Sequence, residues 1–370
     1  MSTPSFMRTL TSFFVLLSVI FSALTAVPVE ELNKTQVKNV IFMIGDGMGE
    51  NHLEKTKQAT GKELVMETLP LRGQSETASA SSAVTDSAAG GTALACGVRT
   101  INGCIGVYNT DFTGAFSHPQ NLCEAAMGIG KKVGVVTTDS TSGATPASFS
   151  AHTSSRSNEK DISEQQLCAG YDLIWGAPSD SVTAEGAQAN GLTFVSSLSE
   201  MNALSAGSKS FGQFSGDLYK AENPTDDQPV LSEMTAKAIE LLDNEDEGFF
   251  LMVEGAHIDK RSHSNDAEGM QEALLEFDKA IATALEFAEQ DGETLIIITA
   301  DHETGGIKKN SDGIYDFTQG SHSGANVPLI IYGSSDFIKD AQAIQNKQVA
   351  IYAARSMGLT PEQFPKKIAA

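Results

Sequence analysis

The chain has 370 residues, of which 41% are hydrophobic, and a formal net charge of −22 at pH 7. This length suffices for one large α/β domain or two small ones. A chain with this much negative charge is not expected to bind nucleic acid through its overall electrostatic field. An anionic substrate would need a locally positive site built from metals or arginine.

The first residues are typical of a secretory signal peptide. Arg8 precedes a short apolar run at residues 11–26, which ends in small residues at Ala26. The run is too short to span a bilayer, no basic stop-transfer cluster follows it, and no cysteine at the cleavage site indicates a lipid anchor. We therefore expect residues 1–26 to be removed near Ala26. The remaining chain should be periplasmic or secreted, without a membrane anchor.

Five apolar, β-branched runs predict strands along the chain. They lie at residues 39–44, 132–138, 248–253, 294–299 and 327–332. Continuous apolar runs are typical of strands that are buried on both faces of a parallel sheet. Apolar residues at helical spacing predict helices between them, most clearly at 231–243 and 268–290. This alternation predicts an α/β fold, a three-layer α/β/α sandwich with a large, mostly parallel central sheet.

One segment departs from this pattern. Residues 157–230 are richer in Ser, Gly, Asn and Asp, and their periodicity is weak. We interpret them as peripheral helices and loops of a single domain that spans residues 27–370.

The stretch VTDSAAGGTALACG predicts a helix that begins at Ser87. Thr85 or Asp86 can cap this helix, and Gly90 and Gly91 favour close approach to its backbone. The free N–H groups and the positive dipole end of a helix would stabilise an anion at Ser87. A serine hydroxyl is a poor nucleophile unless a base or a metal takes its proton. On its own, the stretch is more often a capped surface helix with an ordinary serine.

Metal-competent side chains follow several of the predicted strands. They are Asp46, Glu254, Asp301 and His302. The carboxyl ends of parallel strands meet at one edge of a sheet, where the sites of α/β proteins form. One acid after a strand is ordinary, because Asp favours turns, but four such side chains at equivalent ends indicate a metal site.

Further ligands are predicted from spacing and context. Asp259 and His263 are four residues apart and share one face of a helical turn, and a carboxylate with an imidazole suits zinc. His322 lies in the Gly/Ser-rich run GSHSGANVP, where irregular backbone can present a ligand. The remaining histidines have no such neighbouring ligands and are expected to be structural: His52, His118, His152 and His257. Of these, His257 lies between the candidate ligands Glu254 and Asp259.

Two zinc ions about 4 Å apart would activate Ser87 and hold the leaving oxygen of an in-line displacement. Asp46, Glu254 and a hydroxyl such as that of Thr145 form an oxygen-rich set that suits magnesium. Arg156 would clamp a phosphoryl group through two hydrogen bonds, although a lone arginine is more often a solvated helix residue.

The chain resembles the bacterial alkaline phosphatases over residues 37–360. Six motifs in the same order carry the resemblance: IFMIGDGMG, VTDSAAGGTALACGVRT, ATPASFSAHTSSR, VEGAHIDKRSH, TADHETGG and GSHSGANVP. The resemblance implies hydrolysis of phosphate monoesters at alkaline pH through a phosphoserine on Ser87, with release of inorganic phosphate and an alcohol. Arg156 would bind two phosphate oxygens. Dimers are common in the family, so a homodimer is expected.

The resemblance also implies three metal ions in each chain. One Zn²⁺ would be held by Asp259, His263 and His322, a second Zn²⁺ by Asp46, Asp301 and His302, and one Mg²⁺ by Asp46, Thr145 and Glu254.

One position departs from the family pattern. The residue two before the threonine of the ATP motif is often Asp or His in the family and helps to organise the magnesium site and the arginine, whereas here it is Gly143. Lys260, which can pair with that residue, is retained. We therefore expect Lys260 to be freer to point at the phosphate, with a more exchangeable magnesium and a looser Arg156.

Two alternatives differ from a phosphomonoesterase. Diesterases of the same superfamily tend to use threonine, and sulfatases use a modified Cys or Ser in a motif that is absent here, so Ser87 with Arg156 favours monoesters. A phosphate- or metal-binding descendant with a decayed site is suggested only by Gly143, because the serine and every zinc ligand remain.

An exported protein can form disulfides, and four cysteines allow three pairings. They are Cys96, Cys104, Cys123 and Cys168. A resemblance to animal members around LACGVR suggests Cys96–Cys168, which leaves Cys104–Cys123 as the second pair.

Overall fold

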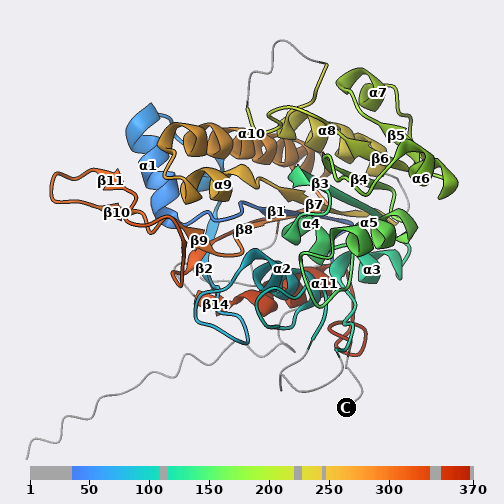
Figure 1. The fold of residues 1–370 in the computed structure, drawn as a ribbon, viewed down its shortest axis with the longest axis horizontal. Helices are drawn as coiled ribbons and strands as arrows, with labels where there is room; N and C mark the ends of the chain where they lie inside the picture. The colour runs from blue at the N-terminus through green and yellow to red at the C-terminus, as the bar shows by residue number, and fades with distance from the viewer. Residues whose placement is uncertain (1–35, 109–115, 221–226, 244–246, 334–342, 367–370) are drawn as a thin grey trace, which may run out of the picture.

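A ten-stranded sheet crosses the molecule, with helices packed on both of its faces (Figure 1). The computed structural model describes residues 36–108, 116–220, 227–243, 247–333 and 343–366. The predicted signal peptide therefore lies outside the described residues. The predicted three-layer α/β fold with a large, mostly parallel sheet is confirmed.

The strands of the central sheet follow one another across the molecule in the order β14 (Ala343–Gln345), β2 (Leu71–Glu76), β13 (Val327–Tyr332), β8 (Thr294–Thr299), β1 (Asn39–Ile44), β7 (Phe249–Glu254), β3 (Lys132–Ser140), β4 (Leu173–Ala177), β6 (Ser210–Gln213) and β5 (Thr193–Val195). Only β13 is antiparallel to its described neighbours, β2 and β8. The five strands predicted from apolar runs are β1, β3, β7, β8 and β13, each within two residues of the expected bounds.

The segment 157–230 contributes three strands that the sequence did not predict. β4, β6 and β5 extend the sheet by parallel pairing beyond β3. They are three to five residues long, and β6 buries the polar side chains of Ser210 and Gln213. The prediction of helices and loops alone was therefore wrong, because runs of three to five residues are too short to show a readable periodicity.

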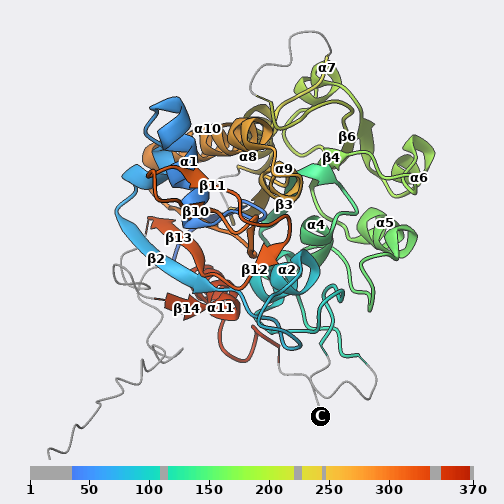
Figure 2. The same cartoon turned by 60° about the vertical axis from the view of Figure 1, so that its left-hand side comes forward.

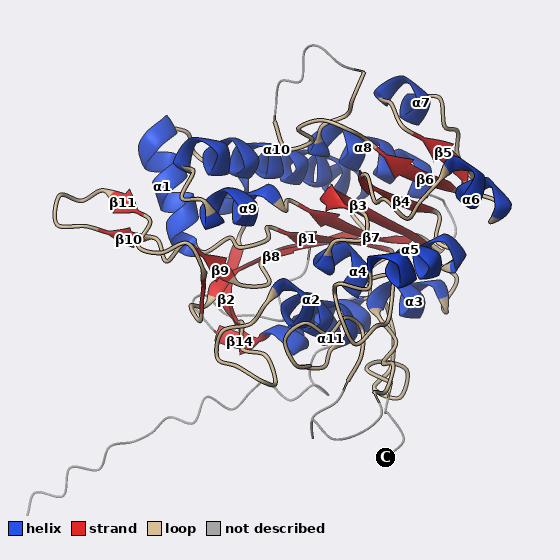
Figure 3. Ribbon diagram, in the orientation of Figure 1, coloured by secondary structure: helices blue, strands red, loops and turns tan. Residues whose placement is uncertain are grey.

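Helices cover both faces of the sheet (Figure 3). One face carries α1 (Glu50–Thr60), the 3₁₀ helix Val65–Thr68, α7 (Leu198–Asn202), α8 (Leu231–Leu242), α9 (His257–His263) and α10 (Ala267–Asp291). The other face carries α2 (Ser87–Cys96), α3 (Leu122–Met127), α4 (Ala144–Ser148), α5 (Glu159–Cys168), α6 (Ala184–Ala189) and α11 (Asn346–Ser356). Among the described residues, no helix combines the length and hydrophobicity needed to cross a bilayer.

The central strand β1 contributes side chains to the hydrophobic cores on both faces of the sheet. Val40, Phe42 and Ile44 pack toward the side of α2 and α11, whereas Ile41 and Met43 pack toward the side of α8 and α10. All are fully buried, as a continuous apolar run in a parallel sheet requires. The helix predicted at 268–290 is α10, which Asp266 caps and which ends at Gly292 in a left-handed conformation.

Two small antiparallel pairs lie outside the central sheet. β9 (Glu303–Thr304) pairs with β12 (His322–Ser323), and β10 (Lys308–Lys309) pairs with β11 (Tyr315–Asp316). In Figure 2, β12 lies close to α2. The first pair matters for function because β12 carries His322 to the start of α2.

Candidate active site

The candidate site lies at the carboxyl ends of four neighbouring strands, β8, β1, β7 and β3. Ile44, near the end of β1, is in register with Glu254 of β7 and Thr299 of β8. Side chains that follow these strands therefore start from one edge of the sheet. The structure brings Asp46, Glu254, Asp301 and His302 together there, as the pattern of strand ends predicted.

Asp46, Asp301 and His302 form a buried group, here called the inner cluster. The His302 Nε2 atom lies 3.4 Å from Asp46 Oδ1 and 3.3 Å from Asp301 Oδ2. Neither of these two oxygens has a hydrogen-bond partner. Burial, and next the charge of Asp301, raises the pKa of Asp46, while burial lowers the pKa of His302. A divalent cation would satisfy these oxygens and relieve the carboxylate repulsion.

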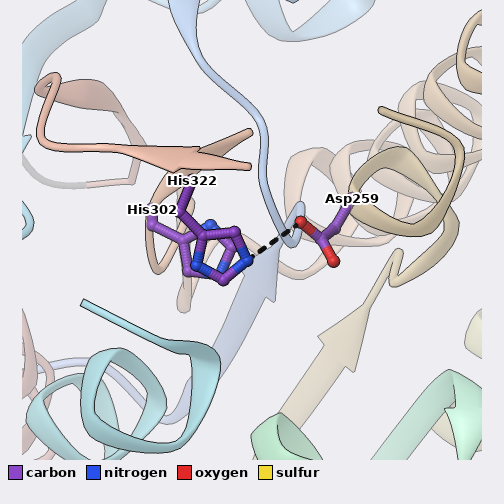
Figure 4. A group of neighbouring side chains, drawn as sticks. All are labelled: Asp259, His302 and His322. Carbon is purple, nitrogen blue, oxygen red and sulfur yellow. Dashed lines mark ion pairs between the residues drawn. The ribbon is translucent and has the colours of Figure 1, made fainter. Parts of the chain in front are cut away.

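Asp259, His263 and His322 form a second group, here called the outer cluster. His263 Nε2 lies 3.3 Å from Asp259 Oδ2 and 3.1 Å from His322 Nε2, and His322 Nε2 lies 3.6 Å from Asp259 Oδ1. The ring of His322 also stacks on the inner-cluster His302, with centroids 3.6 Å apart, so the two clusters adjoin (Figure 4). The hydrogen bond with Asp259 raises the pKa of His263 to about 9, against a smaller effect of burial.

Two residues that the sequence did not single out hold these clusters in place. The Thr304 hydroxyl donates a hydrogen bond to Asp259 Oδ1 and lies 3.2 Å from His302 Nδ1. The Gly47 N–H donates to Asp301 Oδ1 at 3.3 Å. Both lie inside the motifs IFMIGDGMG and TADHETGG, and that position is the only signal that could have found them. Hydrogen bonds to the ligands fix their orientation, as is usual around metal sites.

Ser87 is the first residue of α2, as predicted, and Asp86 is its N-cap. The Ala89 N–H donates to Asp86 Oδ1 at 3.0 Å, and Ser87 Oγ lies 3.2 Å from His302 Nε2. A Cβ atom at Gly90 would lie 3.0 Å from Asp301 Cβ. Gly90 therefore lets the helix start pack against the residues after β8, which places the serine beside the inner cluster, whereas Gly91 permits close packing against Ser148 of α4.

Arg156 reaches the same helix start from the segment after α4. Its Nη1 atom lies 3.3 Å from Asp86 Oδ2, and its side chain is 43% exposed. Asp86 thus caps α2 and also pairs with the arginine. The Arg156 guanidinium is solvent-exposed and lies near Ser87, so an anion bound at the serine could form hydrogen bonds with it.

Thr145 and Glu254 lie on the other side of Asp46. Thr145 Oγ1, Glu254 Oε1 and Asp46 Oδ1 are buried without hydrogen-bond partners, while the Thr137 hydroxyl donates to Glu254 Oε2. Burial, and next the charge of Asp139, raises the pKa of Glu254 to about 8. Two carboxylates and a hydroxyl left unsatisfied in the interior are the donor set that Mg²⁺ prefers.

The prediction that Lys260 points freely at the phosphate is wrong. Its ammonium forms an ion pair with Asp139 Oδ1, a carboxylate at the end of β3. Sequence reasoning assumed that Gly143 leaves Lys260 without an acidic partner. The sheet instead supplies one from the neighbouring strand.

The predicted disulfides are not formed, since all four cysteines are free. Cys96 and Cys123 are buried beneath the sheet, whereas Cys168 is exposed at the end of α5. Cys104 Sγ instead lies 3.3 Å from the carbonyl oxygen of Ser154. The pairings Cys96–Cys168 and Cys104–Cys123 are therefore corrected. The first would join a core thiol to a surface thiol, and in the second both thiols are buried but free.

The four histidines expected to be structural lie outside both metal-capable groups of the described residues. His52 Nε2 lies 3.1 Å from Ser262 Oγ, and His152 Nε2 lies 2.9 Å from Glu124 Oε1. His118 stacks on His152, and His257 stacks on Tyr219 with centroids 4.1 Å apart.

Comparison with known proteins agrees with this geometry. The family model described as "Alkaline phosphatase" matches residues 37–174 and 176–360. Alkaline phosphatase 3 of Bacillus subtilis is 34% identical over 335 residues, which cover 82% of this chain and 71% of that protein. The solved alkaline phosphatase of the Antarctic bacterium TAB5 is 30% identical, with a TM-score of 0.75 over 88% of this chain and 99% of that one. A histidine-to-glutamate variant of the TAB5 enzyme, with Mg bound in its M3 site, is 29% identical, with a TM-score of 0.74 over 89% and 100%. The chain belongs to the alkaline phosphatase family.

Proposed function

We propose that this chain hydrolyses phosphate monoesters at alkaline pH through a phosphoserine on Ser87. The observation that carries the proposal is the position of the Ser87 hydroxyl, 3.2 Å from His302 Nε2 at the start of α2. A nucleophile at a helix start, beside two metal-capable clusters and one exposed arginine, suits the transfer of a dianionic phosphoryl group. Membership of the family supports monoesters as the substrate class.

The donor sets fit the metals that we propose, two Zn²⁺ and one Mg²⁺. The inner and outer clusters combine carboxylates with imidazoles, the ligands of zinc. His302 also lies within reach of Asp259 and His322, while Asp46, Thr145 and Glu254 offer only oxygen. Zinc, when bound, would supply Lewis acidity that favours the deprotonated serine oxygen and offsets charge on the phosphoryl oxygens.

The chain's own residues then perform two displacements. Ser87 Oγ releases its proton to solvent, attacks phosphorus and forms a new O–P bond while the bond to the alcohol oxygen breaks. The alcohol leaves with a proton from water. Arg156 holds two phosphoryl oxygens, and the free N–H groups of α2 face the negative charge. Water then attacks phosphorus, the Ser87–phosphorus bond breaks, and inorganic phosphate leaves. Each step keeps the phosphoryl group at the same helix start.

The proposed alkaline optimum follows from the ligands. Imidazole ligands must be neutral to bind a metal, and the hydrogen bond with Asp259 raises the pKa of His263 to about 9. The serine must also lose its proton before it attacks. Both requirements favour turnover at high pH.

Hydrolysis of an aryl phosphate monoester tests the proposal, measured with zinc and magnesium at alkaline pH. The matching diester and sulfate ester are measured beside it. We expect fast monoester turnover that Ser87→Ala and a chelator each abolish, and a phosphorylated peptide that contains Ser87 after acid quenching. Ser163→Ala is the matched control, because Ser163 is another buried helix serine, whose hydroxyl lies 3.0 Å from that of Ser179.

A preference for the diester or the sulfate would contradict the proposed substrate class. Monoester turnover that survives Ser87→Ala would contradict the phosphoserine. Absence of turnover with any ester would favour a binding protein instead.

Three expectations accompany the proposal. The domain arrangement, with one catalytic domain over residues 27–370, is one of them. The second is a homodimer, which sedimentation of the purified protein would test. The third is export after cleavage near Ala26, which N-terminal sequencing of the mature protein would test.

A further inference from the structure

Asp139 fills the space beside Gly143. A Cβ atom at Gly143 would lie 2.5 Å from Asp139 Oδ2 and 2.8 Å from Asp139 Cγ, closer than real Cβ contacts allow. A side chain at position 143 would therefore displace the Asp139 carboxylate from its observed place, and it would also meet the Ser140 carbonyl oxygen, 2.9 Å from the added carbon. The glycine is the residue that lets the acid from β3 lie here.

The carboxylate of Asp139 is fixed at this place. Its Oδ1 accepts a hydrogen bond from the Ser140 N–H at 2.6 Å and pairs with the ammonium of Lys260. Its own N–H donates to Thr137 Oγ1 at 2.8 Å, and the same Thr137 hydroxyl donates to Glu254. The side chain is 21% exposed. Asp139 and Glu254 are thus tied to one threonine at the ends of adjacent strands.

The electrostatic effects agree with this proximity. The carboxylates of Asp139, Glu254 and Asp46 all lie near enough to the Lys260 ammonium to attract it. Three carboxylates facing one ammonium leave an excess negative charge that one divalent cation would neutralise.

We propose that Asp139 is a positioning acid of the magnesium site, with its carboxylate in the space that a side chain at position 143 would otherwise fill. This inference rests on the proposed function, in which Asp46, Thr145 and Glu254 hold Mg²⁺. The buried, unpartnered oxygens of Thr145 and Glu254 mark where the cation binds. Bound Mg²⁺ would keep several water ligands, and Asp139 would be placed to accept hydrogen bonds from them, while its ion pair holds Lys260.

Magnesium binding to the zinc-loaded protein tests the inference without turnover. Isothermal titration with Mg²⁺ gives Kd for the parent, for Asp139→Asn and for Asp316→Asn. The last is the matched control, because Asp316 also pairs with a lysine, Lys55 at 3.5 Å, but lies on the β10–β11 hairpin. We expect Asp139→Asn to weaken Mg²⁺ binding by about 10- to 100-fold, as loss of a residue that supports metal ligands does. Zinc content and the metal-free thermal midpoint should match the parent.

A double substitution tests whether an acidic side chain at position 143 can take the place of the Asp139 carboxylate. Gly143→Asp alone forces one carboxylate to move, so we expect weaker Mg²⁺ binding than in the parent. Asp139→Ala with Gly143→Asp removes the contact with the Asp139 carboxylate and returns an acid to the site, while the added Cβ atom still lies 2.9 Å from the Ser140 carbonyl oxygen. We therefore expect the double variant to bind Mg²⁺ more tightly than Gly143→Asp alone.

The outcomes separate this inference from the proposed function. A parent that binds Mg²⁺ and hydrolyses monoesters, beside an Asp139→Asn variant with unchanged Kd, would overturn the role of Asp139 alone. Tighter Mg²⁺ binding in the single variant Gly143→Asp would likewise overturn the role of Asp139 alone. A parent that binds no Mg²⁺ would overturn both the inference and the magnesium part of the proposed function, and monoester turnover would then show whether the phosphatase proposal stands.

Discussion

The inner and outer clusters use similar ligands in different surroundings. The inner cluster has side chains that are at most 9% exposed and lies directly at the ends of β1 and β8. The outer cluster draws His263 from the short helix α9 and His322 from the small pair β9–β12, and the His263 side chain is 42% exposed. The ligands of the inner cluster follow strands of the central sheet, whereas those of the outer cluster come from α9 and β12, outside that sheet.

This difference in burial carries an energetic consequence. Buried carboxylates repel each other in a medium where water screens poorly, so the inner cluster depends on a cation for its charge balance. In the outer cluster, water reaches the side chain of His263, which lies 3.3 Å from Asp259. We therefore expect the inner site to bind its metal more tightly and to tolerate substitution less.

Asp301→Asn should show the largest effect. It removes a charge from the inner cluster, and losing several kcal/mol of transition-state stabilisation lowers kcat/KM by roughly 10³-fold. Steady-state monoester hydrolysis measures this, with added zinc giving little rescue. Asp278→Asn is the control, because Asp278 is also buried and accepts two backbone N–H groups, from Val65 and Met66, away from the site. Equal losses in the two variants would mean that the effect is structural.

His263→Gln should have an intermediate effect. It weakens the outer cluster, where water can replace the lost ligand, so we expect zinc affinity and kcat/KM to fall about 10- to 100-fold. Excess zinc should restore much of the activity, which a zinc titration would show. A loss as large and as resistant to zinc as that of Asp301→Asn would remove the proposed difference between the clusters.

Gly47→Ala tests the backbone that joins the clusters. Gly47 has a φ of 74° and donates to Asp301, and a Cβ atom there would lie 2.8 Å from Asp259 Cα. We expect the free energy of unfolding to fall by about 2–3 kcal/mol, measured by urea denaturation of the metal-free protein. Gly61→Ala is matched in conformation, with a φ of 65° but nothing within 4 Å of the added carbon, and should cost about 1 kcal/mol. An equal loss of unfolding free energy in the two variants would show that backbone strain at positive φ, rather than crowding between the clusters, causes the effect of Gly47→Ala.

His152→Gln should have the smallest effect and serves as a baseline outside both clusters. Burial alone would lower the pKa of His152, but the hydrogen bond with Glu124 and its charge raise it above 6.5. The stabilisation from charged His152 is therefore fully present below pH 6.5 and is lost as the pH rises through the raised pKa. We expect the substitution to cost about 1 kcal/mol at low pH, and less at alkaline pH. Urea denaturation on both sides of the transition measures it, and a pH-independent cost would contradict the charged pair.

The predictions that succeeded from the sequence depend on local rules. Strand ends after apolar runs placed Asp46 and Asp301 at one edge, because parallel strands align their carboxyl ends. The spacing of Asp259 and His263 placed them on one helical face. A cap followed by small residues placed Ser87 at a helix start. Each rule needs only neighbours within a few residues.

The predictions that failed depend on partners far apart in the chain. Lys260 meets Asp139 across 121 positions, because β3 lies next to β7 in the sheet. The short strands within 157–230 exist only through pairing along an edge that β3 begins. Cys96 and Cys168 differ in burial because the packing of α2 and α5 decides it.

The sequence by itself therefore determined the fold class, the helix that starts at Ser87 and the metal-competent side chains, since residue type and period carry that information. Only the tertiary structure decided which acid stands beside Gly143, which threonine orients the outer cluster, and whether the thiols meet. Those outcomes depend on which strands become neighbours and on how closely backbones approach, and no local pattern encodes either.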